Sequence, residues 1–271
     1  MDHRFRYDVN LSILFTELDV NSRAAAAKAA GFSAVEFWWP FSAAVPKDAD
    51  VDAFVRSVRE EGVRLIGLNF FAGDMPGGDR GVLSNPARST EFRENIEVAV
   101  EIADQLGCRA FNALYGNRID GVLADQQDEV ARENLAIAAK AASRIGATVL
   151  IEPLSGAPAY PLKTAAEALA VIQRVRQEGG VDNVALLADL YHLAVNGDDP
   201  ARVIDDYSKH IGHVQIADAP GRNEPGTGGL DFADLFERLA ENGYGGYIGL
   251  EYKPSGASAD SFDWLPRDLR A

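Results

Sequence analysis

The sequence predicts a closed barrel of eight parallel strands that alternate with helices, a (β/α)₈ barrel that forms a single domain over residues 1–271. Three observations support this fold class: strand-like and helix-like segments alternate strictly, eight such units occur, and the strand segments are near-continuous apolar runs. Strict alternation favours a parallel sheet, and apolar runs are typical of strands covered on both faces. The length of 271 residues suits a barrel of this type, which commonly takes about 250 residues.

The expected elements of the first half follow from local signals. The first strand is expected at 10–15, followed by a nearly all-alanine helix at 23–30 that ends at Gly31. Alanine is the best helix former, and glycine commonly follows the last helical residue. The other expected strands of this half are 34–39, 64–71 and 108–116, and the other expected helices are 50–61, 89–106 and 127–145.

The second half continues the same alternation. The expected strands are 147–154, 184–190, 212–217 and 246–252, and the expected helices are 164–177, 200–207 and 231–242. The last segment, 258–269, contains Trp264, and we expect this C-terminal extension to pack on the outside. No glycine-rich dinucleotide fingerprint follows the first strand, which argues against an open doubly wound sheet. The glycine-rich loop 72–86 is long, and loops of this length are usually functional or disordered.

Composition and charge argue against several classes of protein. The formal net charge of -15 argues against binding to nucleic-acid phosphates and against an anionic membrane surface. The single cysteine, Cys108, excludes an intramolecular disulfide and permits a reducing compartment. Residues 1–7 lack the apolar core of a signal peptide, and no apolar run approaches the roughly 20 residues of a membrane span. We therefore expect a cytoplasmic protein that acts on a small molecule, with a homo-oligomer left open.

Four apolar runs in the expected strands of the second half end at or near an oxygen-bearing side chain, namely Glu152, Asp189, Gln215 and Glu251. Burying an unpaired charge is costly, and the C-terminal ends of barrel strands face one mouth, where active sites lie. We therefore expect the four residues on one arc of that mouth. Three carboxylates and an amide oxygen suit a hard divalent cation, Mg²⁺ first and Mn²⁺ next. A solvated strand end is the alternative for any one of them alone.

Four further residues are candidates for binding the substrate. His192 follows Asp189 by three residues, in the expected loop after the sixth strand, where it could contact a substrate oxygen. Arg222 and Lys253 follow the seventh and eighth strands and could bind a substrate carboxylate, the alternative being a surface salt bridge. Glu224 could orient Arg222 or the catalytic groups.

Three titratable residues of the expected strands have less certain positions. Glu36 lies inside the second strand and either reaches the mouth or pairs with a neighbouring strand. His210 and His213 lie at the start of the seventh strand. This is the opposite end of the barrel from the expected active site, so we expect structural roles for both histidines.

Several stretches that contain these residues resemble the xylose-isomerase-like TIM barrels, and within them the hydroxypyruvate isomerase family. The related 2-oxo-tetronate isomerases share nearly the same set, and the resemblance spans most of the chain. The matching stretches are 10–17, 31–37, 151–154, 189–192, 213–217 with 220–225, and 249–254, of which the last three are the most specific.

The resemblance implies a divalent metal held by Glu152, Asp189, Gln215 and Glu251, with Glu152 and Glu251 as the acid/base pair. Many sugar epimerases of the superfamily have histidine where Gln215 stands, and glutamine there resembles the hydroxypyruvate isomerase branch. Some relatives have histidine near the position of Asn112 on the fourth strand. This departure affects the expected substrate contacts, and Asn112 is therefore included among the substrate-binding candidates.

The expected function is a metal-dependent isomerase of the aldose-ketose type that interconverts hydroxypyruvate and tartronate semialdehyde. A base would remove a proton next to a carbonyl to give an enediolate, and the metal would stabilise the charge that develops on oxygen. The enzymatic alternatives are a 2-oxo-tetronate isomerase and a ketose 3-epimerase. A non-enzymatic alternative is a sugar-acid binding protein on the same barrel. The net charge of -15 argues against a nuclease.

Overall fold

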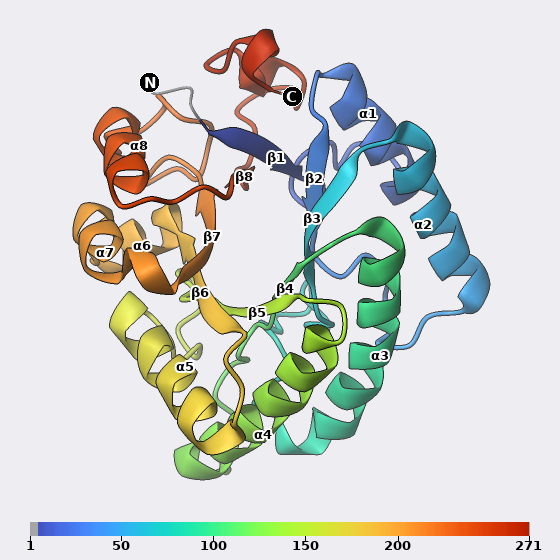
Figure 1. Cartoon of the computed structure of the whole chain (residues 1–271), viewed down its shortest axis with the longest axis vertical. Helices are drawn as coiled ribbons and strands as arrows, with labels where there is room; N and C mark the ends of the chain where they lie inside the picture. Colours follow the sequence, from blue (N-terminus) through green and yellow to red (C-terminus); the bar gives the residue numbers. More distant parts are fainter. Residues whose placement is uncertain (1–4, 271) are drawn as a thin grey trace.

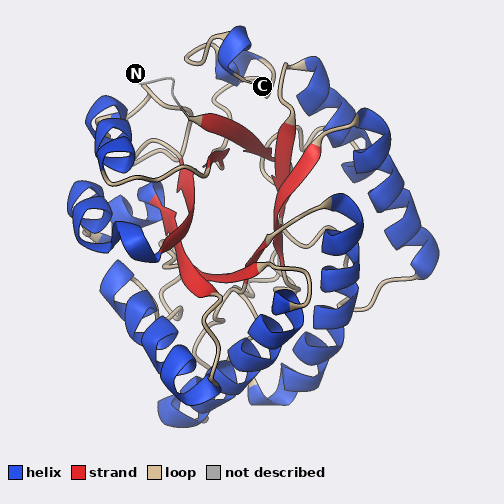
Figure 2. Ribbon diagram, in the orientation of Figure 1, coloured by secondary structure: helices blue, strands red, loops and turns tan. Residues whose placement is uncertain are grey.

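Eight parallel strands close into a barrel in which each strand pairs with its neighbours along the chain and β8 pairs with β1 (Figure 1). The computed structural model describes residues 5–270, so part of the charged N-terminal segment 1–7 lies outside the described residues. Helices surround the strands on all sides (Figure 2). The predicted (β/α)₈ barrel is confirmed.

Most strands are shorter than the sequence patterns suggest, whereas most helices have nearly the expected bounds. The strands are β1 (Arg6–Asn10), β2 (Ala34–Phe37), β3 (Arg64–Asn69), β4 (Ala110–Asn112), β5 (Thr148–Ile151), β6 (Val184–Asp189), β7 (Ile211–Ile216) and β8 (Tyr247–Leu250). The helices are α1 (Arg23–Ala29), α2 (Asp48–Glu61), α3 (Ser89–Leu106), α4 (Ala124–Ser143), α5 (Ala165–Gly179), α6 (Leu190–Asn196), α7 (Pro200–Tyr207) and α8 (Phe232–Glu241).

The prediction of the first strand at 10–15 was wrong, because β1 ends at Asn10. Leu14 donates its backbone N–H to the carbonyl of Asn10 in a turn, and Leu11 and Leu14 are buried above the barrel. The apolar run therefore reflects burial rather than strand structure. The polar residues Asp8 and Asn10 of β1 are both buried.

The helix α6 was also missed by the sequence prediction, which treated the segment after the sixth strand as a loop. Asp189 is its N-cap, and its carboxylate accepts hydrogen bonds from the backbone N–H groups of Tyr191 and His192. Such a cap satisfies amide groups that the helix itself leaves without partners. Asp189 therefore ends a strand and begins a helix, which fixes the position of His192.

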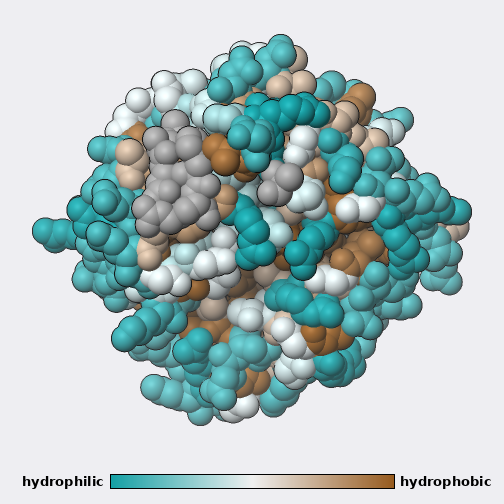
Figure 3. Space-filling view, turned by 45° about the horizontal axis from the view of Figure 1, so that its top comes forward, coloured by the Kyte–Doolittle hydropathy of each residue, from teal (hydrophilic) through white to brown (hydrophobic). Residues whose placement is uncertain are grey.

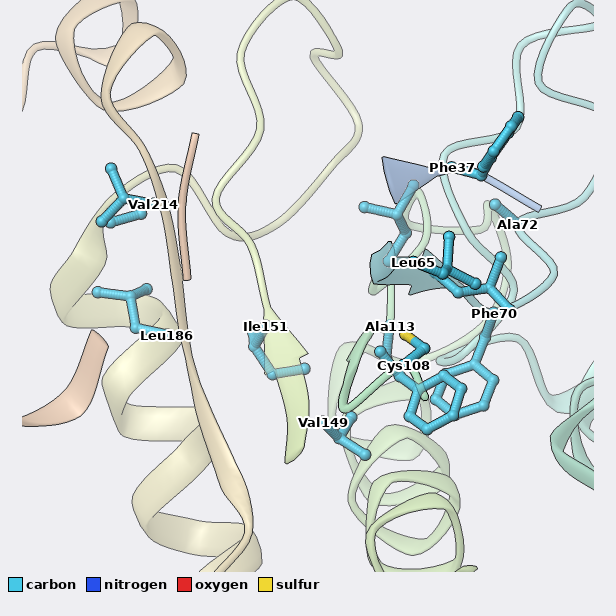
Figure 4. Close-up of a cluster of buried hydrophobic side chains, with 14 of the residues drawn as sticks. Phe37, Leu65, Phe70, Ala72, Cys108, Ala113, Val149, Ile151, Leu186 and Val214 are labelled. Carbon is cyan, nitrogen blue, oxygen red and sulfur yellow. The ribbon is translucent and has the colours of Figure 1, made fainter. Parts of the chain in front are cut away.

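Apolar side chains from the strands fill the space between barrel and helices. Figure 4 shows part of this core, including Phe70, Val149, Ile151, Leu186 and Val214. A separate small cluster of Leu150, Ala185 and Leu187 packs together with Ala110. Because successive strand residues point to opposite faces, Glu152 and Asp189 follow Leu150 and Leu187 on the same face of their strands.

The C-terminal extension packs on the outside beside α1, as predicted (Figure 1). The Phe262 ring lies 4.8 Å from Phe32, and Trp264 lies 5.9 Å from Tyr7, both edge-on. Arg270 donates a hydrogen bond to the carbonyl of Ala30, just after α1. These contacts close the outer layer over β1.

The surface shown in Figure 3 is mostly hydrophilic, with hydrophobic side chains in scattered patches. This agrees with the composition, of which 25% is charged. Within residues 5–270, a membrane-crossing helix of sufficient length and apolar character is not found.

The glycine-rich loop after β3 is folded against the loop after β4. Gly81 has a φ of 106°, and a Cβ atom there would lie 2.0 Å from the backbone oxygen of Leu114. Gly78 has a similar φ of 110° but open space around it. A side chain at either glycine would strain the backbone, but only a side chain at Gly81 would also collide with a neighbouring atom.

We expect Gly81→Ala to lower the free energy of unfolding by more than about 1 kcal/mol, and by more than Gly78→Ala does. Both substitutions strain a positive φ, but only Gly81→Ala forces a side chain against a backbone carbonyl. Urea unfolding of the two variants beside the unaltered protein measures the difference. Equal losses in the two variants would contradict the packing described for this loop.

Candidate active site

The four predicted strand ends come together at one mouth of the barrel. The strand register places Asp189 beside Gln215, and Gln215 beside Gly249 of β8. The side chains of Glu152, Asp189, Gln215 and Glu251 are all at least 96% buried. Carboxylate oxygens of Glu152, Asp189 and Glu251 lie within 4.8 Å of one another. The predicted arc of polar residues is therefore present in the fold.

Three of these four residues have a buried oxygen without a hydrogen-bond partner among the described residues. The atoms are Glu152 Oε1, Asp189 Oδ2 and Gln215 Oε1. Buried polar atoms normally have partners, and buried carboxylates are paired or bind metals. Burial raises the pKa of Asp189 to about 6 and the pKa of Glu251 to about 8. A divalent cation would satisfy all three oxygens and offset this crowding of acids, so the donor set fits a hard metal ion.

Glu251 has the most hydrogen bonds of the four. Its Oε1 accepts from Arg222 Nη2 at 2.5 Å. Its Oε2 accepts from Asn10 Nδ2 at 2.8 Å and from Gln215 Nε2 at 2.7 Å. Trp38 Nε1 is a further donor at 3.3 Å. Burial raises the pKa of Glu251, and the charge of Arg222 and the hydrogen bond from Trp38 oppose this rise.

The amide of Gln215 has its orientation set by two acceptors. Gln215 Nε2 donates to Glu36 Oε1 at 2.6 Å as well as to Glu251 Oε2. Because the nitrogen is engaged on that side, the oxygen Oε1 is left free for another ligand. Glu36, for which we expected either a position at the mouth or a salt bridge to a neighbouring strand, is a buried neighbour of the site.

Glu36 also belongs to a second buried cluster, which contains Asp8 and His213. His213 Nε2 lies 2.9 Å from Glu36 Oε2. Burial alone would lower the pKa of His213, but the hydrogen bond with Glu36 outweighs it and raises this pKa to about 9. Asp8 completes the cluster and is fully buried. Gly249 makes room for it, since a Cβ there would lie 2.9 Å from Glu36 Oε1 and 3.0 Å from His213 Nε2. His213, for which we expected a structural role, thus supports a residue that contacts the candidate metal ligand Gln215.

His192 presents a proton donor to the candidate site. Its Nδ1 accepts a hydrogen bond from the backbone N–H of Ser155 at 3.0 Å, so in the neutral ring the proton is on Nε2. Nε2 lies 3.6 Å from Asp189 Oδ2 and 3.9 Å from Glu152 Oε1. Burial, and then the charge of Arg222, hold the pKa of His192 well below its usual value. A protonated Nε2 cannot bind a metal, but it can donate to a substrate oxygen.

Arg222 reaches the site from the loop after β7. The carboxylate of Asp218 organises this loop by accepting from the backbone N–H groups of Gly226 and Gly228, each at 2.8 Å. Arg222 has a φ of 61°, a conformation that non-glycine residues seldom adopt. Besides its contact with Glu251, its Nη2 lies 4.0 Å from Asp189 Oδ2. The guanidinium is therefore held among the candidate metal ligands.

Of the three remaining predicted residues, Asn112 and Lys253 lie at the site, whereas Glu224 does not. Asn112 Nδ2 donates to Glu152 Oε2 at 2.7 Å, so it contacts a predicted catalytic residue directly. Lys253 lines the same cavity as Glu152 and Glu251, which has a volume of about 760 Å³. Glu224 instead accepts from the backbone N–H of Ser255 at 3.0 Å and does not line the cavity. Its predicted contact with Arg222 or the catalytic groups is not present among the described residues.

Sequence reasoning did not single out several residues of this site. Asn10 donates to Glu251 from β1, and Ser155 orients His192. Arg80 lines the cavity from the long loop after β3. That loop was the one available signal, because its length and glycine content marked it as functional or disordered.

Comparisons with known proteins give a consistent result. Residues 24–267 match the family described as xylose isomerase-like TIM barrel. A Streptomyces coelicolor protein named "Putative hydroxypyruvate isomerase" is 54% identical, covering 98% of this chain and 97% of its own. A "2-oxo-tetronate isomerase" of Cupriavidus necator is 35% identical, with 96% and 97% covered. The crystal structure titled AP endonuclease, family 2, from Brucella melitensis has a TM-score of 0.86 and 34% identity, with 96% and 98% covered.

Proposed function

Because the chain belongs to the xylose isomerase-like TIM barrel family, we propose that it is a divalent-metal-dependent isomerase that interconverts hydroxypyruvate and tartronate semialdehyde. The observation that carries the proposal is the set of three buried, unpartnered oxygens on Glu152, Asp189 and Gln215 beside Glu251. The name of the 54% identical Streptomyces relative supports this choice of substrate.

Glu152, Asp189, Gln215 and Glu251 would hold the metal through oxygen atoms, a donor set that suits Mg²⁺ and Mn²⁺. When bound, the cation would act as a Lewis acid that stabilises negative charge on the substrate oxygens. The absence of cysteine from this set, with His192 protonated on Nε2, argues against a zinc site of the usual kind.

The two glutamates would transfer the protons. In hydroxypyruvate the reacting carbon C3 lies next to the C2 carbonyl, and removal of a C3 proton gives an enediolate. Returning a proton at C2, together with transfer of the hydroxyl proton from the C3 oxygen to the C2 oxygen, gives tartronate semialdehyde with no net oxidation. Glu251, with its several donors, is suited to act as the base. Glu152, with Asn112 as donor and a free Oε1, is suited to supply the proton.

His192 and Arg222 would bind the oxygens on which charge develops. His192 Nε2–H is a neutral donor aimed between Asp189 and Glu152. Arg222 carries a fixed positive charge beside Glu251. Donors positioned before the reaction stabilise developing charge without reorganisation.

The substrate assignment is tested by measuring kcat/KM for hydroxypyruvate, 2-oxo-tetronate and free ketoses with the Mg²⁺-loaded protein. We expect the highest value for hydroxypyruvate. A higher value for 2-oxo-tetronate would favour the second candidate, which the 35% identical Cupriavidus necator relative supports by its name. A higher value for a ketose would favour a 3-epimerase, and substrate binding without any turnover would favour a binding protein.

A nuclease activity is the less favoured reading, although one similar structure carries an endonuclease title. The site has a cluster of acids, and the whole chain has a formal net charge of -15. Nucleic-acid binding depends on Lys and Arg that neutralise phosphates. The acid-rich site suits a small substrate held through a metal better than it suits a polyanion.

We expect Glu36→Gln to weaken Mn²⁺ binding by about 10- to 100-fold, the usual effect of altering a group that orients a metal ligand. Glu36 uses one carboxylate oxygen for Gln215 and Asn10 and the other for His213, whereas an amide has only one acceptor oxygen, so one of these contacts is lost and the support of Gln215 is weakened. Electron paramagnetic resonance of free Mn²⁺ measures the affinity without reference to turnover. Glu178→Gln on exposed α5 serves as the control and should bind Mn²⁺ normally. Unchanged affinity in Glu36→Gln would contradict the orienting role.

A further inference from the structure

The long glycine-rich loop between β3 and α3 contributes a cation to the candidate active site. Arg80 of this loop lines the same cavity as Glu152, His192, Arg222 and Glu251. Met75 and Pro76 of the loop line it as well. The loop that stood out in the sequence is therefore one wall of the site.

The loop is held in one conformation by hydrogen bonds of its own. Asp79 is at their centre: its carboxylate accepts the backbone N–H of Asp74 at 2.8 Å and pairs with Arg88 at 2.7 Å. The backbone N–H of Gly81 donates to the carbonyl of Ala72 at 2.9 Å, which closes the loop at its base. Asn117, from the loop after β4, donates to the carbonyl of Gly78 at 3.0 Å. Arg80 therefore extends from a loop whose backbone is fixed by hydrogen bonds.

The guanidinium of Arg80 is positioned but not neutralised. Its Nη1 donates to the carbonyls of Met75 at 3.0 Å and of Asp79 at 2.6 Å. Within residues 5–270, no carboxylate lies within 4.0 Å of it, and its Nε and Nη2 have no protein acceptor. Arg88 and Arg222, in contrast, are paired with acids. Arg80 thus keeps free donors for an anionic ligand.

The proposed substrate has an anionic group that needs such a partner. Hydroxypyruvate, the enediolate and tartronate semialdehyde all keep the same C1 carboxylate, which takes no part in the proton transfer. Entering a cavity that contains Glu152, Asp189 and Glu251 is unfavourable for this group unless a cation faces it. Arg222 pairs with Glu251 through Nη2, and its buried Nε, which has no partner among residues 5–270, would serve the oxygens on which charge develops, so the carboxylate needs a second cation. A guanidinium offers donors in a planar fork that matches a carboxylate.

We propose that Arg80 binds the substrate carboxylate and thereby selects small oxo acids over neutral sugars. This inference rests on the proposed isomerase function and adds the residue that determines its substrate class. Lys253, the other cation of the cavity without an acidic partner among residues 5–270, is the competing candidate. Its charge is a point charge on an exposed, flexible stem, whereas Arg80 has a fixed support.

The test compares hydroxypyruvate with dihydroxyacetone, in which a neutral CH₂OH group replaces the carboxylate. We expect Arg80→Gln to lower kcat/KM for hydroxypyruvate by about 10- to 100-fold, mainly through KM, because one charge-assisted contact is lost. The value for dihydroxyacetone should not change. Arg80→Lys should give a smaller loss. If Arg80→Gln does not fold, the test uses Arg80→Lys and compares its kcat/KM for hydroxypyruvate with its kcat/KM for dihydroxyacetone. An equal loss with both substrates, or a loss with Lys253→Gln in place of Arg80→Gln, would overturn the proposal.

Binding of glycerate, measured by calorimetry on the Mg²⁺-loaded protein, separates this proposal from the isomerase function. Glycerate carries the carboxylate but no carbonyl, so its binding does not depend on turnover. We expect Arg80→Gln to weaken glycerate binding about as much as it raises KM for hydroxypyruvate. A protein that binds glycerate through Arg80 but does not convert hydroxypyruvate would reject the isomerase function alone. Glycerate binding that is unchanged in Arg80→Gln would reject the role of Arg80.

Discussion

Replacing either Glu152 or Glu251 by glutamine is expected to lower kcat for hydroxypyruvate by at least about 10²-fold. An amide keeps the shape of the side chain and an oxygen that can bind a metal, but it can neither accept nor release the proton. The effect should therefore be on turnover more than on metal binding. Both residues are nearly fully buried and approach each other in one cavity, so solvent cannot readily take their place.

Glu224→Gln is the control variant for these two substitutions. Glu224 was a candidate from the sequence, but it bonds Ser255 and does not line the cavity. Its variant should keep nearly full activity. Rates are to be measured at saturating Mg²⁺, so that a weaker metal affinity does not count as a loss of chemistry. Near-normal turnover in both Glu152→Gln and Glu251→Gln would reject the acid/base roles.

Removal of divalent metal is expected to abolish turnover, and Mg²⁺ or Mn²⁺ is expected to restore it. Without a cation, the free oxygens of Glu152, Asp189 and Gln215 have no partner to offset their burial. Binding should also stabilise the fold, by about 2.7 kcal/mol when the free metal is at 100 times its Kd. Turnover and thermal unfolding, measured on chelator-treated protein before and after metal is added, report the two effects separately.

Asp189→Ala is the matched variant for the metal experiment. It removes one proposed ligand and leaves Glu152 and Glu251 in place. Added metal should therefore restore less activity and less stability to this variant than to the unaltered protein. Because Asp189 also caps α6, its variant should be compared with Asp199→Ala, which removes the cap of α7 away from the site. Full activity of the unaltered protein after complete metal removal would disprove the metal requirement.

The barrel and the four strand ends could be predicted from the sequence because both depend on local patterns. Apolar runs of strand length alternating with helices predict the fold, and Glu152, Asp189 and Gln215 each lie at or near the end of a separate run. The first strand escaped this reasoning because its inward residues, Asp8 and Asn10, are polar. Burial of polar residues inside a barrel depends on partners from distant strands, which a local pattern does not contain.

The supporting contacts of the site could not be predicted for the same reason. Glu36 meets Gln215 across 179 positions of sequence, and Asn10 meets Glu251 across 241. These contacts exist only because β1, β2, β7 and β8 are neighbours in the closed barrel. The position of Arg80 depends on how the loop after β3 folds, which is set by backbone contacts such as Gly81 with Ala72.

The most direct test of the proposed reaction is the conversion of hydroxypyruvate in D₂O, followed by proton nuclear magnetic resonance with the Mg²⁺-loaded protein. A sample without protein corrects for uncatalysed exchange. If one glutamate removes the C3 proton and the other supplies the C2 proton from solvent, tartronate semialdehyde should carry deuterium at C2. A product that keeps the original hydrogen at C2 would contradict the two-glutamate route, and the absence of product would contradict the isomerase function itself.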